Sequence, residues 1–145
     1  MDRTRSFSLL LGFVVLAFAV LGATVYSLPA PMATGVSSVH VADVNADNAP
    51  DVLSASGGRD EIAWHRNEDG SFSNRQTIKE RAGGVRAVFA ADLDGDGDPD
   101  VLSTSLYTDR IAWYENTDGY GSFSDQKVIE SDAANPLSVY AAKLD

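Results

Sequence analysis

An internal repeat constrains this chain more than any other feature, because it limits the fold to copies of one structural unit. Residues 39–70 align with residues 88–119 at a spacing of 49, and the aligned positions share acidic, aromatic and turn-forming residues. Two inserted residues, Tyr120 and Gly121, then change the spacing to 51, and a third copy begins at Val139. Such units bury their apolar faces against neighbouring units of the same kind.

Each unit is expected to form four short strands. In the first unit, β-branched and apolar runs predict strands at residues 36–42, 51–56, 62–66 and 72–78. Asn67, Asp69 and Gly70 mark a hairpin turn. Ile62 and Trp64 share one strand face because side chains alternate. Four strands per unit is the pattern of a propeller blade. We therefore predict an all-β fold of antiparallel four-stranded β-propeller-type blades, about two repeats that form a partial propeller.

The alignment predicts five segments along the chain. They are a signal peptide or signal anchor at 1–27, a linker at 28–35, a first repeat at 36–87, a second repeat at 88–138 and the start of a truncated third repeat at 139–145.

The N-terminal segment is typical of an export signal. Arg3 and Arg5 precede an apolar run over residues 7–25, and Ser27 offers a cleavage site before Leu28. If the run is not cleaved, it is long enough to begin to anchor the chain in a membrane. In both cases the arginines favour the cytoplasmic side. The repeats are therefore expected to be secreted and extracellular, or membrane-anchored and facing outward.

The charge balance narrows the range of partners. The chain has 11 Lys and Arg against 21 Asp and Glu, a formal net charge of −10. This excess repels nucleic-acid phosphates, so no nucleic acid is expected as a partner. A hydrophobic content of 44% indicates a packed chain rather than disorder. Because the chain has no cysteine, extracellular stability has to come from packing, assembly or bound metal.

The acidic segment of the second repeat places carboxylates at alternate positions. These residues are Asp92, Asp94, Asp96, Asp98 and Asp100. Without a cation their charges would repel one another. Calcium takes about six to eight oxygen ligands, which a curled carboxylate loop can supply, whereas magnesium demands a smaller octahedron. The pattern therefore predicts a Ca²⁺ site.

The first repeat supports this assignment, because its loop keeps an oxygen-bearing side chain everywhere except at the seventh position. The aligned residues are Asp43, Asn45, Asp47, Ala49 and Asp51. In calcium loops of this type the seventh residue ligates through its carbonyl, for which Ala49 serves as well as Asp98. At the sixth position Gly97 is matched by Asn48, and both residue types tolerate a left-handed backbone. An EF-hand is excluded because the twelfth position is serine in both loops. We expect tighter binding at the second loop, which carries more charge.

These residues resemble the FG-GAP or VCBS-type repeats, which build the calcium-bearing β-propeller of integrin α subunits and of many exported proteins. The resemblance covers about residues 36–145 and rests mainly on 88–103 and 111–123. It implies that side chains at the first, third, fifth and ninth loop positions, and the carbonyl at the seventh, ligate calcium. Serine-containing triplets at 54–56 and 103–105 stand where Gly-Ala-Pro would, and the Phe-Gly pair is missing. An integrin-like ligand role is therefore not carried over, and the looser VCBS-type description fits better.

We expect the protein to be an extracellular calcium-binding β-propeller module with a structural, adhesive or protein-binding role. Two alternatives are a calcium-dependent, lectin-like module in which Trp64 and Trp113 stack on sugars, and a non-catalytic fragment of a larger secreted enzyme. A tryptophan repeated in each blade is more often blade-to-blade core. The expected partner is a protein or glycan on the cell exterior. Because two repeats rarely bury a continuous core, we expect a fragment of a longer propeller or self-association.

No catalytic constellation is visible in the sequence. His40 and His65 are the only histidines, and the second repeat has Phe89 and Tyr114 at their positions. We therefore interpret both histidines as ordinary strand residues. A nucleophile elbow, a phosphate loop and a zinc pattern are all missing from the sequence, so we expect neither enzymatic activity nor catalytic residues.

Overall fold

The computed structural model describes residues 35–73 and 75–142. In this part of the chain the strands are β1 (Val36–Ala42), β2 (Asp51–Ser56), β3 (Glu61–His65), β4 (Asn67–Glu68), β5 (Ser71–Phe72), β6 (Gln76–Glu80), β7 (Val85–Ala91), β8 (Asp100–Ser105), β9 (Arg110–Tyr114) and β10 (Lys127–Glu130).

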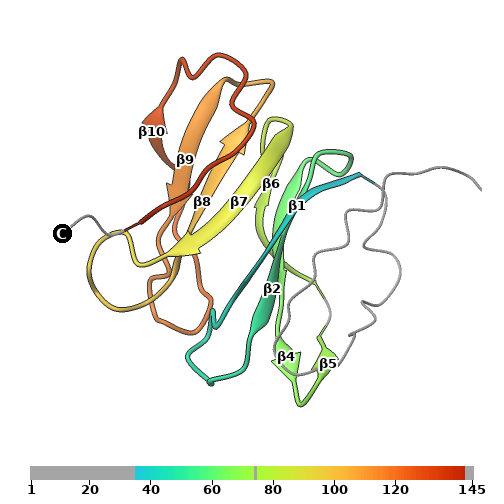
Figure 1. Ribbon diagram of the computed structural model, residues 1–145, viewed down its shortest axis with the longest axis vertical. Helices are drawn as coiled ribbons and strands as arrows, with labels where there is room; N and C mark the ends of the chain where they lie inside the picture. Colours follow the sequence, from blue (N-terminus) through green and yellow to red (C-terminus); the bar gives the residue numbers. More distant parts are fainter. Residues whose placement is uncertain (1–34, 74, 143–145) are drawn as a thin grey trace, which may run out of the picture.

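Two four-stranded sheets lie side by side (Figure 1). The first has the order β1-β2-β3-β6 and the second the order β7-β8-β9-β10, and the neighbouring strands in each are antiparallel. We call them blade 1 and blade 2. The innermost strands β1 and β7 are adjacent, and the Val88 N–H donates to Ser38 Oγ across them at 3.4 Å. The predicted all-β fold of antiparallel four-stranded blades is confirmed.

The outer strand of blade 1 lies later in the chain than the sequence pattern indicates. A strand was expected at residues 72–78, but Phe72 belongs to β5 and the strand that pairs with β3 is β6. The reason is a local turn between β4 and β5. Asp69 and Gly70 have φ values of 52° and 86°, as a tight hairpin turn requires, and the Gly70 N–H donates to Asn67 Oδ1 at 2.9 Å. This small ribbon takes the chain out of the sheet before β6 begins.

The hydrophobic core lies between the two blades. Blade 1 contributes Val44, Leu53, Ala55, Ile62 and Trp64, and blade 2 with the segment before it contributes Ala82, Val85, Val88, Val101 and Tyr114. This arrangement follows from the period-two pattern of each strand, since an apolar face of one sheet is removed from water by the next sheet.

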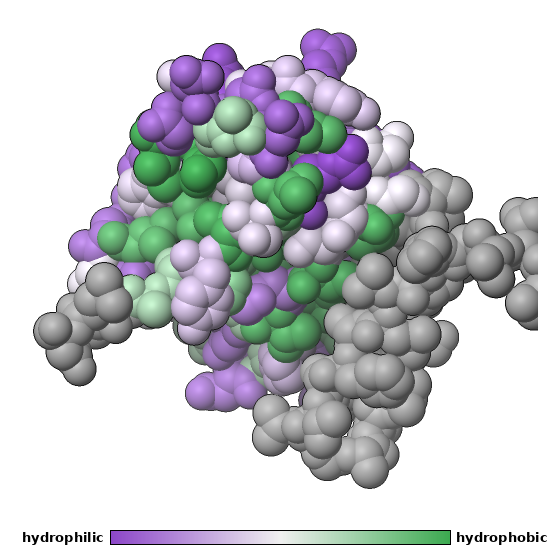
Figure 2. Space-filling view, turned by 45° about the horizontal axis from the view of Figure 1, so that its top comes forward, coloured by the Kyte–Doolittle hydropathy of each residue, from purple (hydrophilic) through white to green (hydrophobic). Residues whose placement is uncertain are grey.

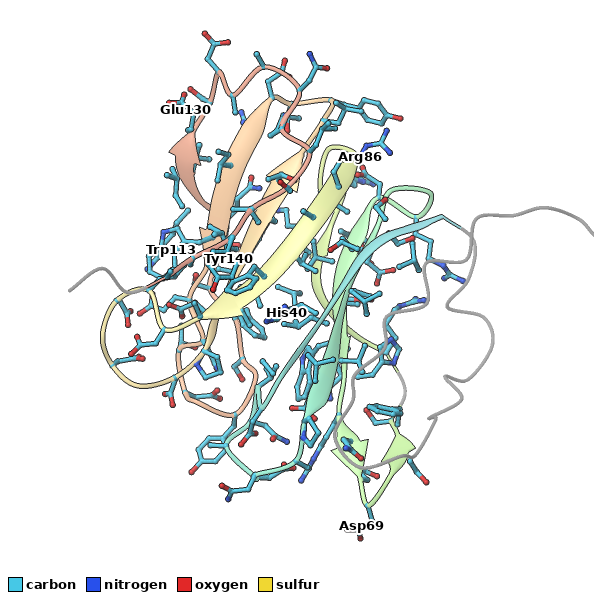
Figure 3. All side chains as sticks on the ribbon, in the orientation of Figure 1. His40, Asp69, Arg86, Trp113, Glu130 and Tyr140 are labelled. Carbon is cyan, nitrogen blue, oxygen red and sulfur yellow. The ribbon has the colours of Figure 1, made fainter. Side chains whose placement is uncertain are left out.

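The inner strands also align an aromatic row. His40 and Phe89 occupy equivalent positions in β1 and β7, and their ring centroids are 4.3 Å apart. Tyr140, the equivalent residue of the third copy, continues the row at 4.7 Å from Phe89 (Figure 3). The beginning of the third copy therefore contacts β7 through this pair of rings.

Blade 2 exposes more apolar surface to solvent than blade 1. Val44 is 0% exposed because blade 2 covers it, whereas its equivalent Leu93 is 37% exposed because no further blade covers it among the described residues. Figure 2 shows apolar side chains at the surface on the side of blade 2, mixed with polar ones. The other exposed large hydrophobic residues are Val41, Tyr107, Tyr120, Val128, Ile129, Leu137 and Tyr140.

The predicted signal segment, its apolar run and almost all of the linker lie outside the described residues. In residues 35–73 and 75–142 there is no helix of the length and apolarity needed to cross a membrane.

Candidate metal centre

The two acidic loops connect the first and second strands of their blades, so each lies at the corresponding end of its own sheet (Figure 1). Each loop curls through two left-handed residues. In the second loop these are Gly95 and Gly97, with φ values of 88° and 98°. In the first loop they are Ala46 and Asn48, at 57° and 64°. The sequence predicted the sixth position and missed the fourth, because alanine rarely adopts this conformation.

The second loop brings three carboxylates together. One oxygen from each of Asp92, Asp94 and Asp100 lies within 4.8 Å of the others. Backbone donors hold the group in place, since the Gly95 and Gly97 N–H groups donate to Asp92 at 2.7 and 3.2 Å. An all-oxygen group of this kind is the donor set that a hard cation such as calcium prefers.

Asp96 and Asp98, also predicted as site residues, lie outside this group of three. Asp96 Oδ1 accepts the Asp98 N–H at 2.9 Å. The Asp98 carboxylate lies against Gly119, where an added Cβ would be 2.6 Å from Asp98 Oδ2. The Asp98 N–H therefore bonds within the loop, whereas its side chain points toward Gly119 and away from the three converging carboxylates.

Asp100 joins the loop to the rest of the blade. Its side chain is 0% exposed, and it accepts N–H groups from Leu93 at 3.0 Å and from Asn116 at 2.8 Å. Burial raises the pKa of Asp100 above its ordinary value of 3.8, although both N–H donors act in the opposite direction. The buried carboxylate is therefore an anion for which a nearby cation would be favourable.

Asp51 repeats this arrangement in blade 1. It is 0% exposed and accepts N–H groups from Val44 at 3.0 Å and Asn67 at 2.7 Å. Burial likewise raises its pKa above 3.8, and the charges of Asp47 and Asp43 raise it further. The ninth loop position is thus equivalent in the two blades.

The remaining side chains of the first loop are engaged differently. Asp43 accepts the N–H groups of Asp47 and Asn48 at 3.1 and 2.9 Å. Asn45 donates through Nδ2 to Asp47 Oδ2 at 3.0 Å. Arg66 forms an ion pair with Asp47 at 3.1 Å. The Ala49 N–H donates to Asp47 Oδ1 at 2.9 Å, so the residue whose carbonyl is the predicted ligand is itself hydrogen-bonded to the ion-paired carboxylate.

Arg66 was not singled out from the sequence. The signal available was a mismatch in the alignment, because Glu115 stands at the same position of the second repeat.

The Trp and His residues singled out in the sequence occupy different environments. Trp64 is 3% exposed and packs against Gly121 of blade 2, where a Cβ would clash with its ring. Trp113 is half-buried at the outer side of blade 2, with Lys127 Nζ 4.4 Å from the ring centroid (Figure 3). His65 is buried, and its Nδ1 lies 3.2 Å from the Ser73 carbonyl. Burial lowers the pKa of His40.

The fold and these loops define a protein built from propeller-type β-repeats with an acidic loop in each blade. Comparison with protein families identifies the repeat, since the FG-GAP-like repeat matches residues 43–103 and again residues 94–145. The chain belongs to the FG-GAP-like repeat family. Searches of curated proteins and of solved structures found no match.

Proposed function

We propose that this protein is an extracellular β-propeller repeat module whose acidic loops bind calcium and whose surface binds a protein or glycan partner. The observation that carries the calcium assignment is the convergence of Asp92, Asp94 and Asp100 within 4.8 Å in a loop of the FG-GAP-like repeat. Repulsion among these charges makes a cation favourable there.

The residues fit calcium in chemical type, and Asp92, Asp94 and Asp100 also fit it in position. In the second loop Asp92, Asp94, Asp96 and Asp100 would ligate through side chains and Asp98 through its carbonyl. In the first loop the corresponding residues are Asp43, Asn45, Asp47, Ala49 and Asp51. A hard divalent ion would offset the negative charges of these carboxylates.

The proposed role of calcium is structural. Asp100 contacts both its own loop and Asn116, and Asn116 Nδ2 donates to the Val44 carbonyl of blade 1 at 2.9 Å. A cation at the second loop would therefore stabilise a region that joins the two blades. The proposal assigns no catalytic step to the protein.

The exposed apolar side of blade 2 supports assembly with further blades. Two blades do not close a propeller ring, which typically has four to eight. We propose that further blades, from a longer chain or a second copy, cover this side and that the completed module acts in adhesion or protein binding. The burial of Trp64 argues against the alternative in which both tryptophans form a sugar-stacking surface.

Thermal unfolding of the full chain with calcium and with a chelator tests the metal assignment. A ligand at ten to a hundred times its Kd stabilises the folded state by about 1.4 to 2.7 kcal/mol, so calcium at about 10 mM should raise Tm by several degrees. Extracellular modules of this kind bind with a Kd of about 10⁻⁴ to 10⁻³ M.

Two substitutions in the second loop give the matched comparison. Asp94→Ala removes a member of the converging group and should abolish most of the shift. Asp98→Ala leaves the backbone carbonyl, reproduces the Ala49 of the first loop and should preserve the shift. An unchanged Tm in millimolar calcium, or an equal loss in both variants, would contradict the assignment.

A further inference from the structure

We infer that Arg66 acts as a built-in competitor for the cation of the first loop, so that the two loops differ in calcium affinity through this side chain. The inference rests on the proposed function and deepens it, because it assigns unequal occupancy to two loops of the same repeat family.

The contacts of Asp47 carry the argument. Arg66 donates to Asp47 Oδ2 through Nε at 3.2 Å and through Nη2 at 3.1 Å. The Asn45 amide donates to the same oxygen at 3.0 Å, and the Ala49 N–H donates to Oδ1 at 2.9 Å. Three donor atoms therefore converge on Asp47 Oδ2 and one on Oδ1. A cation at this carboxylate has to compete with the guanidinium for Oδ2.

Among residues 35–73 and 75–142, no Lys or Arg side chain forms an ion pair with the second loop. Asp94 and Asp96 each accept one turn N–H through Oδ1, at 3.2 and 2.9 Å. In the described part of the chain no donor reaches their Oδ2 atoms. Glu115 stands in place of Arg66 and pairs with Lys127, which itself lies over the Trp113 ring. The residue equivalent to Arg66 therefore adds no positive charge to the second loop.

The backbone around the two positions is the same. The Arg66 N–H donates to Ser73 Oγ at 3.0 Å, and the Glu115 N–H donates to Ser124 Oγ at 3.0 Å. The main chain at residue 115 therefore has the same contacts as the main chain at residue 66. In a Glu115→Arg variant the side chain should reach the second loop as Arg66 reaches the first. The chain thus offers a reciprocal exchange as an internal control.

The expected effect is electrostatic. A unit positive charge a few ångströms from a bound divalent ion in a water-like dielectric lowers its affinity by roughly tenfold, and salt reduces this factor. The ion pair itself is solvent-exposed, with side-chain exposures of 45% and 26%. Exposed pairs contribute little to stability, so replacing Arg66 should change calcium binding without unfolding the protein.

The experiment is a calorimetric titration of the full chain with calcium chloride at low ionic strength. Asp94→Ala is used as the background in which the first loop is measured alone. In that background Arg66→Gln should increase calcium affinity roughly tenfold, and Arg66→Glu should increase it further. Arg75→Gln is the control, because Arg75 pairs with Glu61 at 2.9 Å and its loss changes the net charge equally without involving Asp47.

The reverse exchange is measured in the second loop. In a background of Asp43→Ala, which disables the first loop, Glu115→Arg should weaken calcium binding roughly tenfold. The inference is overturned if Arg66→Gln leaves the first loop's affinity unchanged, if neither Asp94→Ala nor its Arg66→Gln derivative binds calcium, or if Arg75→Gln has the same effect. These results leave the proposed function intact when the unmodified chain binds calcium at its second loop. The proposed function itself fails only if the unmodified chain does not bind calcium.

Discussion

Asn116 should contribute more to stability than its repeat equivalent Asn67, because only Asn116 joins the two blades. Asn116 is 0% exposed, and its Nδ2 donates to the Val44 carbonyl at 2.9 Å and to the Pro99 carbonyl at 3.4 Å. Its Oδ1 accepts the Gly121 N–H at 3.2 Å. Asn116→Ala removes these partners together and leaves a buried carbonyl of the neighbouring blade without its donor.

The magnitude follows from the groups left unpaired. A buried polar group without a partner costs about 1 to 3 kcal/mol, so losing the contacts to Val44 and Gly121 should lower the free energy of unfolding by about 2 to 4 kcal/mol. Asn67→Ala is the matched control. Its side chain bonds to the Pro50 carbonyl at 3.0 Å and to the Gly70 N–H at 2.9 Å, both within blade 1, and we expect a cost of about 1 kcal/mol.

Urea unfolding of the full chain, followed by tryptophan fluorescence and circular dichroism at fixed calcium concentration, measures both values. The midpoint of Asn116→Ala should fall well below that of Asn67→Ala. Equal costs, or a cost below about 0.5 kcal/mol for Asn116→Ala, would refute the conclusion that this side chain couples the blades.

Further predictions concern the core, the loop backbone and pH. Trp64→Ala should lower the free energy of unfolding by about 3 to 5 kcal/mol and Trp113→Ala by about 1 to 2 kcal/mol, because only Trp64 is covered by a second blade; similar urea midpoints would contradict this. Ala46→Gly should stabilise the chain by about 1 kcal/mol and Gly95→Ala should destabilise it by a similar amount, since both positions are left-handed; a Tm change of the opposite sign in either variant would argue against strain at Ala46. The raised pKa values of Asp51 and Asp100 give the folded state without metal a contribution that is present below pH 3.8 and lost as pH rises through the raised values. Calcium binds the ionised form, so its stabilisation should be large at about pH 7 and should fall as pH drops through the raised pKa values of Asp51 and Asp100. A calcium-induced Tm shift independent of pH would count against these carboxylates as ligands.

The sequence predicted the local structure well because that structure depends on neighbouring residues. The bounds of β1 and β2 follow from apolar and β-branched runs, and the curl of the loops follows from Gly97 and Asn48. The end of the first unit was the exception. Phe72 continues an apolar pattern, but the Asp69-Gly70 turn places it in a separate ribbon, and the pattern alone does not say which strand its backbone joins.

The sequence by itself determined that the chain consists of repeated four-stranded units, each with an alternating acidic loop, because both features recur in the second copy. Only the tertiary structure decided how equivalent residues come to differ. Trp64 is buried and Trp113 is half-buried because the described residues place a blade over the first alone. Arg66 pairs with Asp47, 19 residues earlier in the chain, because the fold brings the end of β3 beside the first loop. Such contacts depend on the relative placement of sheets and side chains. The repeated sequence predicts the strands of each unit, but it does not predict which surfaces a neighbouring unit covers.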